Sequence, residues 1–80
     1  MPTLVQLRER AMLSQSEVAA LCDVATHTVY YWESGRRVPR LKQQRKLVEA
    51  LHCTPEELWA ALKETKEGRR KQEEKERPAA

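Results

Sequence analysis

The sequence predicts an all-α fold, a compact bundle of five helices over residues 1–62. Apolar residues recur three and four positions apart through most of this region, which is the period of a helix with one buried face. Two Ser/Thr-x-x-Glu patterns, Ser14–Glu17 and Thr54–Glu57, are typical of helix starts, because these side chains cap free backbone N–H groups. Only a short stretch around Asp23 separates two helical segments, so a tight turn joins them. Eighty residues leave room for one domain with a small core.

The first two helices each carry one apolar stripe. The first is expected over residues 3–12, and the second from about Gln15 to Asp23, behind the Ser14 cap. The residues expected to be buried are Leu4, Leu7 and Ala11 in the first helix and Val18, Ala19 and Cys22 in the second. Asp23 tolerates the left-handed conformation in which many helices end.

The third helix is expected from about Thr26 to Ser34, with Gly35 closing it. Val29 and Trp32 lie three apart and face inward, and Trp32 must fill space in a chain without Phe. The polar or mixed side chains left on other faces are Thr26, His27, Thr28 and Tyr31. Ala25 cannot cap the helix, so the helix starts either uncapped or one residue later.

Two more helices follow, over residues 41–51 and from Pro55 onward. The buried stripe of the first is expected at Leu47, Val48 and Leu51, with Gln43, Gln44 and Arg45 outside. In the second, Leu58, Trp59 and Leu62 are expected on one face. Residues 63–80 hold many charges of both signs and no large apolar residue, so they are expected to be disordered or a frayed helix interrupted at Gly68. Ending the chain after Glu64 is therefore expected to leave folding nearly unchanged.

The order of these features resembles a known family. LRERAMLSQSEVAALCDVATHTVYYWESGRRVPR followed by LVEALHCTPEELW is similar to the lambda repressor, Cro and Xre type of helix-turn-helix regulator over residues 4–62. In that fold the first helix of the motif braces the second, which enters the major groove of DNA. The resemblance implies an ion pair between Arg8 and Glu33. Met12 and Asp23 stand where the family often has Gly, which implies left-handed backbone at both positions.

The resemblance also assigns DNA contacts residue by residue. Thr26, His27 and Tyr31 occupy base-reading positions, Thr28 a phosphate-contacting position, and Gln15 a position beside a phosphate or a base edge. Hydroxyl, imidazole and ring groups can meet base edges in the major groove, although none of them specifies a single base. His27 can equally be an ordinary exposed histidine.

A basic run follows the third helix directly. Six Lys or Arg side chains fall within eleven residues that contain no Asp or Glu, at Arg36, Arg37, Arg40, Lys42, Arg45 and Lys46. Beside a groove-reading helix such a run can neutralise phosphates, so Arg36, Arg37 and Arg40 are expected to contact the DNA backbone. Arg45 and Lys46 can equally lie on a solvated face. The tail has Arg69, Arg70 and Lys71, but five nearby glutamates argue against a direct DNA role.

Other functional classes have little support. The net charge is +3, and no apolar run is long enough to cross a bilayer or to act as a secretion signal, so the protein is expected to be cytoplasmic. Cys22 and Cys53 are interpreted as free thiols, since their spacing with His27 and His52 fits no zinc pattern. No cofactor or metal is expected, and the absence of catalytic motifs makes an enzyme the least supported class.

The sequence therefore indicates a regulator of transcription, a repressor that binds double-stranded DNA at an operator. Modules of this shape generally bind palindromic sites as homodimers, for which Trp59 and Leu62 are candidates unless they complete the core. Two alternatives stay open. HTVYYWESGRRVP also resembles the recognition helix of winged-helix excisionase-type proteins, and the tail could fold on a protein partner, as in an antitoxin.

Overall fold

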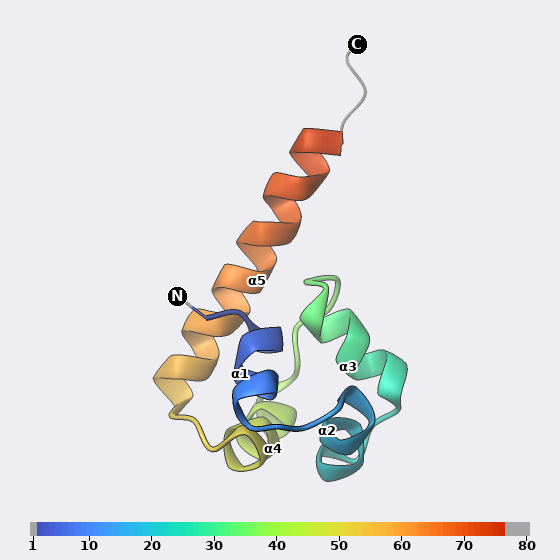
Figure 1. The fold of residues 1–80 in the computed structure, drawn as a ribbon, viewed down its shortest axis with the longest axis vertical. Helices are drawn as coiled ribbons and strands as arrows, with labels where there is room; N and C mark the ends of the chain where they lie inside the picture. The colour runs from blue at the N-terminus through green and yellow to red at the C-terminus, as the bar shows by residue number, and fades with distance from the viewer. Residues whose placement is uncertain (1, 77–80) are drawn as a thin grey trace.

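The computed structural model describes residues 2–76, with side chains through Lys71, and this part of the chain forms five helices and no strand (Figure 1). The helices are α1 (Leu4–Arg10), α2 (Gln15–Cys22), α3 (Thr26–Glu33), α4 (Leu41–Leu51) and α5 (Pro55–Glu76). The predicted all-α, five-helix fold is confirmed. Helices α1 and α4 pack on the lower half of α5, whose upper half extends beyond the other helices (Figure 1).

Reciprocal hydrogen bonds cap three of the helices. At the start of α2 the Glu17 N–H donates to Ser14 Oγ over 3.1 Å, and the Ser14 N–H donates to Glu17 Oε1 over 3.0 Å. Thr54 and Glu57 make the same pair of bonds before α5, at 3.1 and 3.0 Å. A third box, which the sequence analysis missed, joins Thr3 to Gln6 and starts α1. Gln can replace Glu at this position because its side-chain oxygen also accepts a backbone N–H.

The chain leaves three helices through left-handed residues. Met12 has φ of 60° and Asp23 has φ of 57°, as the resemblance implied, and His52 has φ of 51° after α4. Met12 is also 89% exposed, so its side chain adds little packing to offset the backbone cost. The third helix starts at Thr26 with no side-chain cap from Ala25, the first of the two alternatives left open by the sequence.

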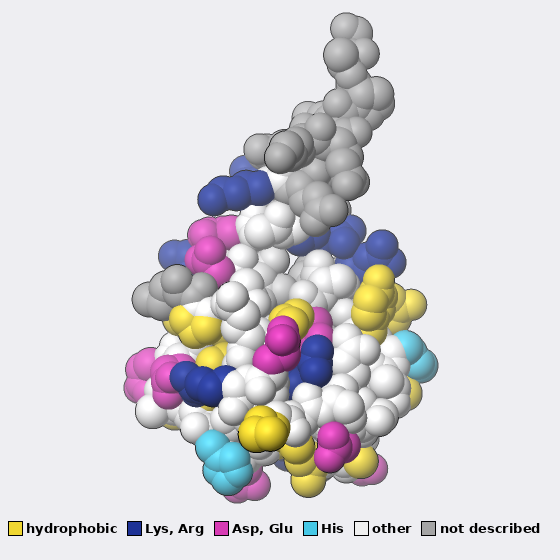
Figure 2. Space-filling view, in the orientation of Figure 1, with side chains coloured by type: hydrophobic (Ala, Val, Ile, Leu, Met, Phe, Trp, Pro, Cys, Tyr) yellow, Lys and Arg dark blue, Asp and Glu magenta, His cyan; other side chains and the backbone are white. Residues whose placement is uncertain are grey.

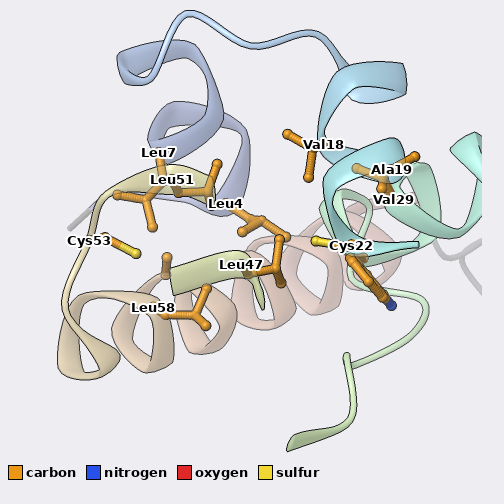
Figure 3. Close-up of a cluster of buried hydrophobic side chains, with 12 residues drawn as sticks. Leu4, Leu7, Val18, Ala19, Cys22, Val29, Leu47, Leu51, Cys53 and Leu58 are labelled. Atoms are coloured by element: carbon orange, nitrogen blue, oxygen red, sulfur yellow. The ribbon is translucent and has the colours of Figure 1, made fainter. Parts of the chain in front are cut away.

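One core joins the five helices. Its side chains point toward one another between the helices, as Figure 3 shows. The buried members are Leu4, Leu7, Val18, Ala19, Cys22, Val29, Trp32, Leu47, Leu51, Cys53, Leu58 and Ala61. Trp32 is 2% exposed, which confirms its prediction as a core residue. Val48 and Leu62 pack against this cluster and are only partly buried.

The prediction that Leu58, Trp59 and Leu62 share one face of α5 was wrong, because only Leu58 and Leu62 face the core. Leu58 is fully buried, but Trp59 is 55% exposed, because neighbouring residues of a helix point about 100° apart. Ala61 is buried in its place. The Trp59 indole N–H donates to Gln44 Oε1 over 3.1 Å, and the Gln44 amide donates to the Pro39 carbonyl over 2.8 Å. Gln44 thus links Trp59 of α5 to the loop before α4 through two hydrogen bonds.

Helix α5 continues past residue 62 and runs through Gly68 to Glu76, so the interruption expected at Gly68 does not occur. Thr65 is buried; its hydroxyl donates to the Ala61 carbonyl over 2.8 Å and accepts the Leu4 N–H over 3.1 Å. The start of the predicted tail therefore packs on the first helix. Residues 77–80, to which the prediction for the tail also applied, lie outside the described residues.

Candidate nucleic-acid interface

The turn between α2 and α3 sets the position of the third helix. Asp23 adopts the left-handed conformation, and the Val24 N–H then donates to the Ala19 carbonyl over 2.9 Å, which ends α2 and reverses the chain. Val29 and Trp32 of α3 are buried in the core that α2 lines with Val18 and Ala19. Because one face of α3 is held in this way, the opposite face is presented to solvent.

The outward face of α3 carries the predicted reading residues. Thr26 and His27 are exposed, and Thr28 and Tyr31 are half-buried. The His27 and Tyr31 rings lie one turn apart with their centroids separated by 5.8 Å, in an edge-to-face arrangement. Such a pair restricts the rotamers of both rings, so this part of the exposed surface is partly preorganised.

Tyr31 also holds the start of the basic loop. The Arg37 guanidinium lies over the Tyr31 ring, 5.3 Å from its centroid, in a cation–π contact. The backbone N–H groups of Arg36 and Arg37 donate to the Tyr31 carbonyl, at 3.0 and 3.3 Å. His27, Tyr31 and Arg37 therefore form one continuous row along the outside of α3. The link between Tyr31 and Arg37 was not predicted, although an aromatic residue six positions before an Arg, across a helix end, offered a signal for it.

The three arginines assigned to phosphates are all exposed. Arg36 and Arg37 follow Gly35, whose φ of 78° ends α3. Arg40 comes after the buried Pro39 and is the last residue before α4, where its N–H donates to Gln43 Oε1 over 2.9 Å. The structure thus places Arg36 and Arg37 beside Tyr31, and Arg40 farther along the loop at the start of the next helix.

An ion pair ties α1 to α3. The Arg8 Nε and Nη2 groups donate to the two carboxylate oxygens of Glu33, and the second of these bonds is 3.3 Å long. Arg8 Nη1 also donates to the Leu13 carbonyl over 2.9 Å. The Glu33 side chain is 5% exposed, so most of its charge is neutralised inside the protein rather than by solvent.

Gln15 lies in this same network. Its Nε2 group donates to Glu33 Oε1 over 2.9 Å, which links the start of α2 to the end of α3. An amide also carries a second N–H and a carbonyl oxygen, so this bond does not use up its capacity to meet a phosphate or a base edge. The link from Gln15 to Glu33 was not predicted from the sequence.

The cysteines lie away from this face. Burial raises the pKa of the Cys22 thiol, against an opposing effect of Lys46, and burial followed by the charge of Glu57 raises the pKa of the Cys53 thiol. Both are free thiols. Within the part of the chain that the structure describes, no group of three or more His, Cys, Asp or Glu side chains could hold a metal ion, and no helix could cross a membrane.

Comparison with known proteins gives one finding. A family model described as a helix-turn-helix domain matches residues 3–62, which include α1 to α4 and the first part of α5. No curated protein and no solved structure gives a significant match.

Proposed function

Since the chain belongs to the helix-turn-helix domain family, whose members place a recognition helix against DNA, we propose that it is a sequence-specific regulator of transcription. It binds double-stranded DNA in the cytoplasm with α3 in the major groove. The observation that carries this proposal is the row of His27, Tyr31 and Arg37, because it sets groups suited to base edges beside a cation suited to phosphate.

In this proposal the residues divide into two sets. Thr26, His27 and Tyr31 read base edges from the outer face of α3. The groups that hold the phosphate backbone are Gln15, Thr28, Arg36, Arg37 and Arg40. The second set supplies affinity that does not depend on sequence, and the first set supplies the choice of site.

We further propose that the protein is a repressor of the lambda repressor, Cro and Xre type that binds a palindromic operator as a homodimer. Two-fold sites match a two-fold protein because each copy then reads one half-site. Of the two residues considered for the dimer contact, Leu62 packs against the core, whereas Trp59 is exposed beside Leu41 and Val48. Trp59 is therefore the better candidate.

The winged-helix alternative loses its support, because residues 41–51 and 55–76 are helical where such a protein continues in strands. The remaining alternative is an antitoxin-like module that binds a protein through the C-terminal part of α5 as well as binding DNA. Its support is that this part of α5 extends beyond the packed core (Figure 1).

Selection of bound sequences from random duplex DNA tests the proposal. We expect a palindromic consensus, with selection by a Tyr31→Ala variant giving a weaker one. A variant at exposed Glu9, on α1, serves as the matched control and is expected to give the same consensus as the unaltered protein. Failure to enrich any sequence, with the protein folded, would overturn the proposal in favour of a protein partner.

A further inference from the structure

The part of α5 beyond the core lies against the end of the recognition helix. Gly35 sits at this contact: a Cβ atom built on it would lie 3.1 Å from the Thr65 carbonyl oxygen and 3.1 Å from Arg69 Cβ. Arg69 Cδ would be 3.3 Å away. Gly35 is thus required here both by its φ of 78° and by the approach of α5. The base of the Arg69 side chain is fixed at the point where the basic loop begins.

Arg69 and Arg36 also line the same hollow. It lies between α5 and the end of α3, and its other lining residues include Tyr30, Ser34 and Gly68. In Figure 2, Lys and Arg side chains gather where α5 passes the end of α3. The basic surface that starts at Arg37 and Arg36 therefore continues across the gap onto α5.

Charges on this part of α5 are sorted by face. Residues 63–71 contain five Lys or Arg and two Glu. At about 100° per residue, Lys63, Lys66, Arg69 and Arg70 fall within an arc of about 120°, and Glu64 and Glu67 fall outside it. Glu64 and Glu67, two of the five glutamates that argued against a DNA role for the tail, therefore lie outside the basic arc, although Glu64 lines the hollow. Glu33, which also lines the hollow, is already bonded to Arg8 and Gln15.

We propose that residues 66–70 of α5 form a second phosphate-binding element, in which Arg69 contacts the DNA backbone next to the phosphates held by Arg36 and Arg37. This inference rests on the proposed function. The partner is a phosphodiester group because Arg69, beside Arg36 and off the outward face of α3, offers charge and N–H donors but no selection among bases. Since the Arg69 stem packs at Gly35, little side-chain entropy is lost when its guanidinium binds.

Arg69→Met tests this assignment, because Met keeps an unbranched stem at Gly35 and removes the charge. We expect binding to the selected site and to random DNA to weaken equally, with the slope of log affinity against log salt falling by about 0.9. The ratio of wild-type to variant affinity should then narrow about 3.5-fold between 50 and 200 mM salt, as that slope requires. Arg69→Lys keeps the charge and should retain the wild-type slope, and thermal melting of both variants checks folding.

Lys71→Met is the matched control, since Lys71 is a basic residue of the same segment about 200° around the helix from Arg69. It should leave the salt slope unchanged. Two results would overturn the inference, provided that Arg36→Met still lowers the salt slope. One is an unchanged salt slope in Arg69→Met, and the other is an equal fall of the slope in Lys71→Met. If the wild-type protein binds no duplex DNA, the proposed function itself fails, and the two failures are therefore distinguishable.

Discussion

Glu33 receives three hydrogen bonds from two other helices, two from Arg8 of α1 and one from Gln15 of α2. Arg8 is 17% exposed and Glu33 is 5% exposed, so the pair is largely shielded from solvent. Because Glu33 is the last residue of α3, the pair sets how α3 is oriented relative to the rest of the bundle. A loss at either residue should therefore affect both folding and DNA binding.

Changes at the two partners are expected not to add. Arg8→Ala should cost about 1.5–3 kcal/mol in the free energy of unfolding, because it removes two charged hydrogen bonds from a buried carboxylate. Glu33→Ala leaves an unpaired guanidinium, and the double variant should lose less than the sum of the two single losses. Denaturant unfolding of the four proteins measures this coupling, and simple additivity would count against the pair.

Met12→Gly is expected to be neutral or to stabilise the protein by up to about 1 kcal/mol. The reason is that Gly adopts φ of 60° without the steric cost of a Cβ atom, and the exposed Met12 side chain loses little packing. Asp23→Gly, at φ of 57° on an exposed residue, is a second case of the same effect. Thermal unfolding measures both, and a clear destabilisation in Met12→Gly would show that its side chain packs on the core.

Ending the chain after Glu64 should destabilise the protein, contrary to the expectation from composition. Such a chain lacks the Thr65 hydroxyl, which accepts the buried Leu4 N–H and ties α5 to α1. Thr65→Val keeps the shape of the side chain, removes both hydrogen bonds of the hydroxyl and leaves the Leu4 N–H unpaired, at a cost of about 1–3 kcal/mol. Thermal unfolding compares the chain ended after Glu64 and the Thr65→Val variant with a chain that ends after Lys71. This last chain retains Thr65 and should melt close to the full chain.

Substitutions of the proposed base-reading residues and of the proposed phosphate-contacting residues are expected to affect DNA binding in different ways. His27→Ala or Tyr31→Ala should cost about 1–3 kcal/mol on the selected sequence and little on random DNA. Arg36→Ala should weaken both complexes about equally and lower the salt slope by about one unit. Tyr31→Ala also removes the ring under Arg37, so Tyr31→Phe, which keeps the ring, is its control. Titration of labelled duplexes at several salt concentrations measures these effects. The opposite pattern would show that α3 does not read the bases. In that pattern the arginine variants change the sequence preference, and the His27 and Tyr31 variants change only the salt slope.

Acid should weaken two of the helix caps. The Ser14 backbone hydrogen bond is the main reason that the pKa of Glu17 lies below its ordinary value, and the Thr54 backbone does the same for Glu57. A carboxyl with a lowered pKa in the folded state stabilises the fold above its unfolded pKa and loses this effect as pH falls through its folded pKa. The stability difference between the wild type and Glu17→Gln should therefore shrink as pH falls below the ordinary range of Glu, as pH-dependent unfolding can measure. A stability difference between the wild type and Glu17→Gln that is the same at neutral and acid pH would contradict this prediction.

The sequence by itself determined the features that depend on neighbouring residues. The Ser14 and Thr54 boxes cap helices because each needs only a side chain and a backbone group three residues away. Val29 and Trp32 are buried together because a helix carries both on one face. The family resemblance gave the left-handed Met12 and Asp23 and the pairing of Arg8 with Glu33, which local spacing does not reveal.

Only the tertiary structure decided which face of each helix is buried and which residues pack against it. Spacing relates Leu58, Trp59 and Leu62 to one another, but the packing of α5 on α1 and α4 leaves Trp59 outside and encloses Thr65. The contact of Gly35 with Arg69 is likewise invisible in the sequence, since 34 positions separate them along the chain. The physical reason is that helix period sets relative directions within one helix, whereas the burial of a given residue depends on surfaces supplied by the other four.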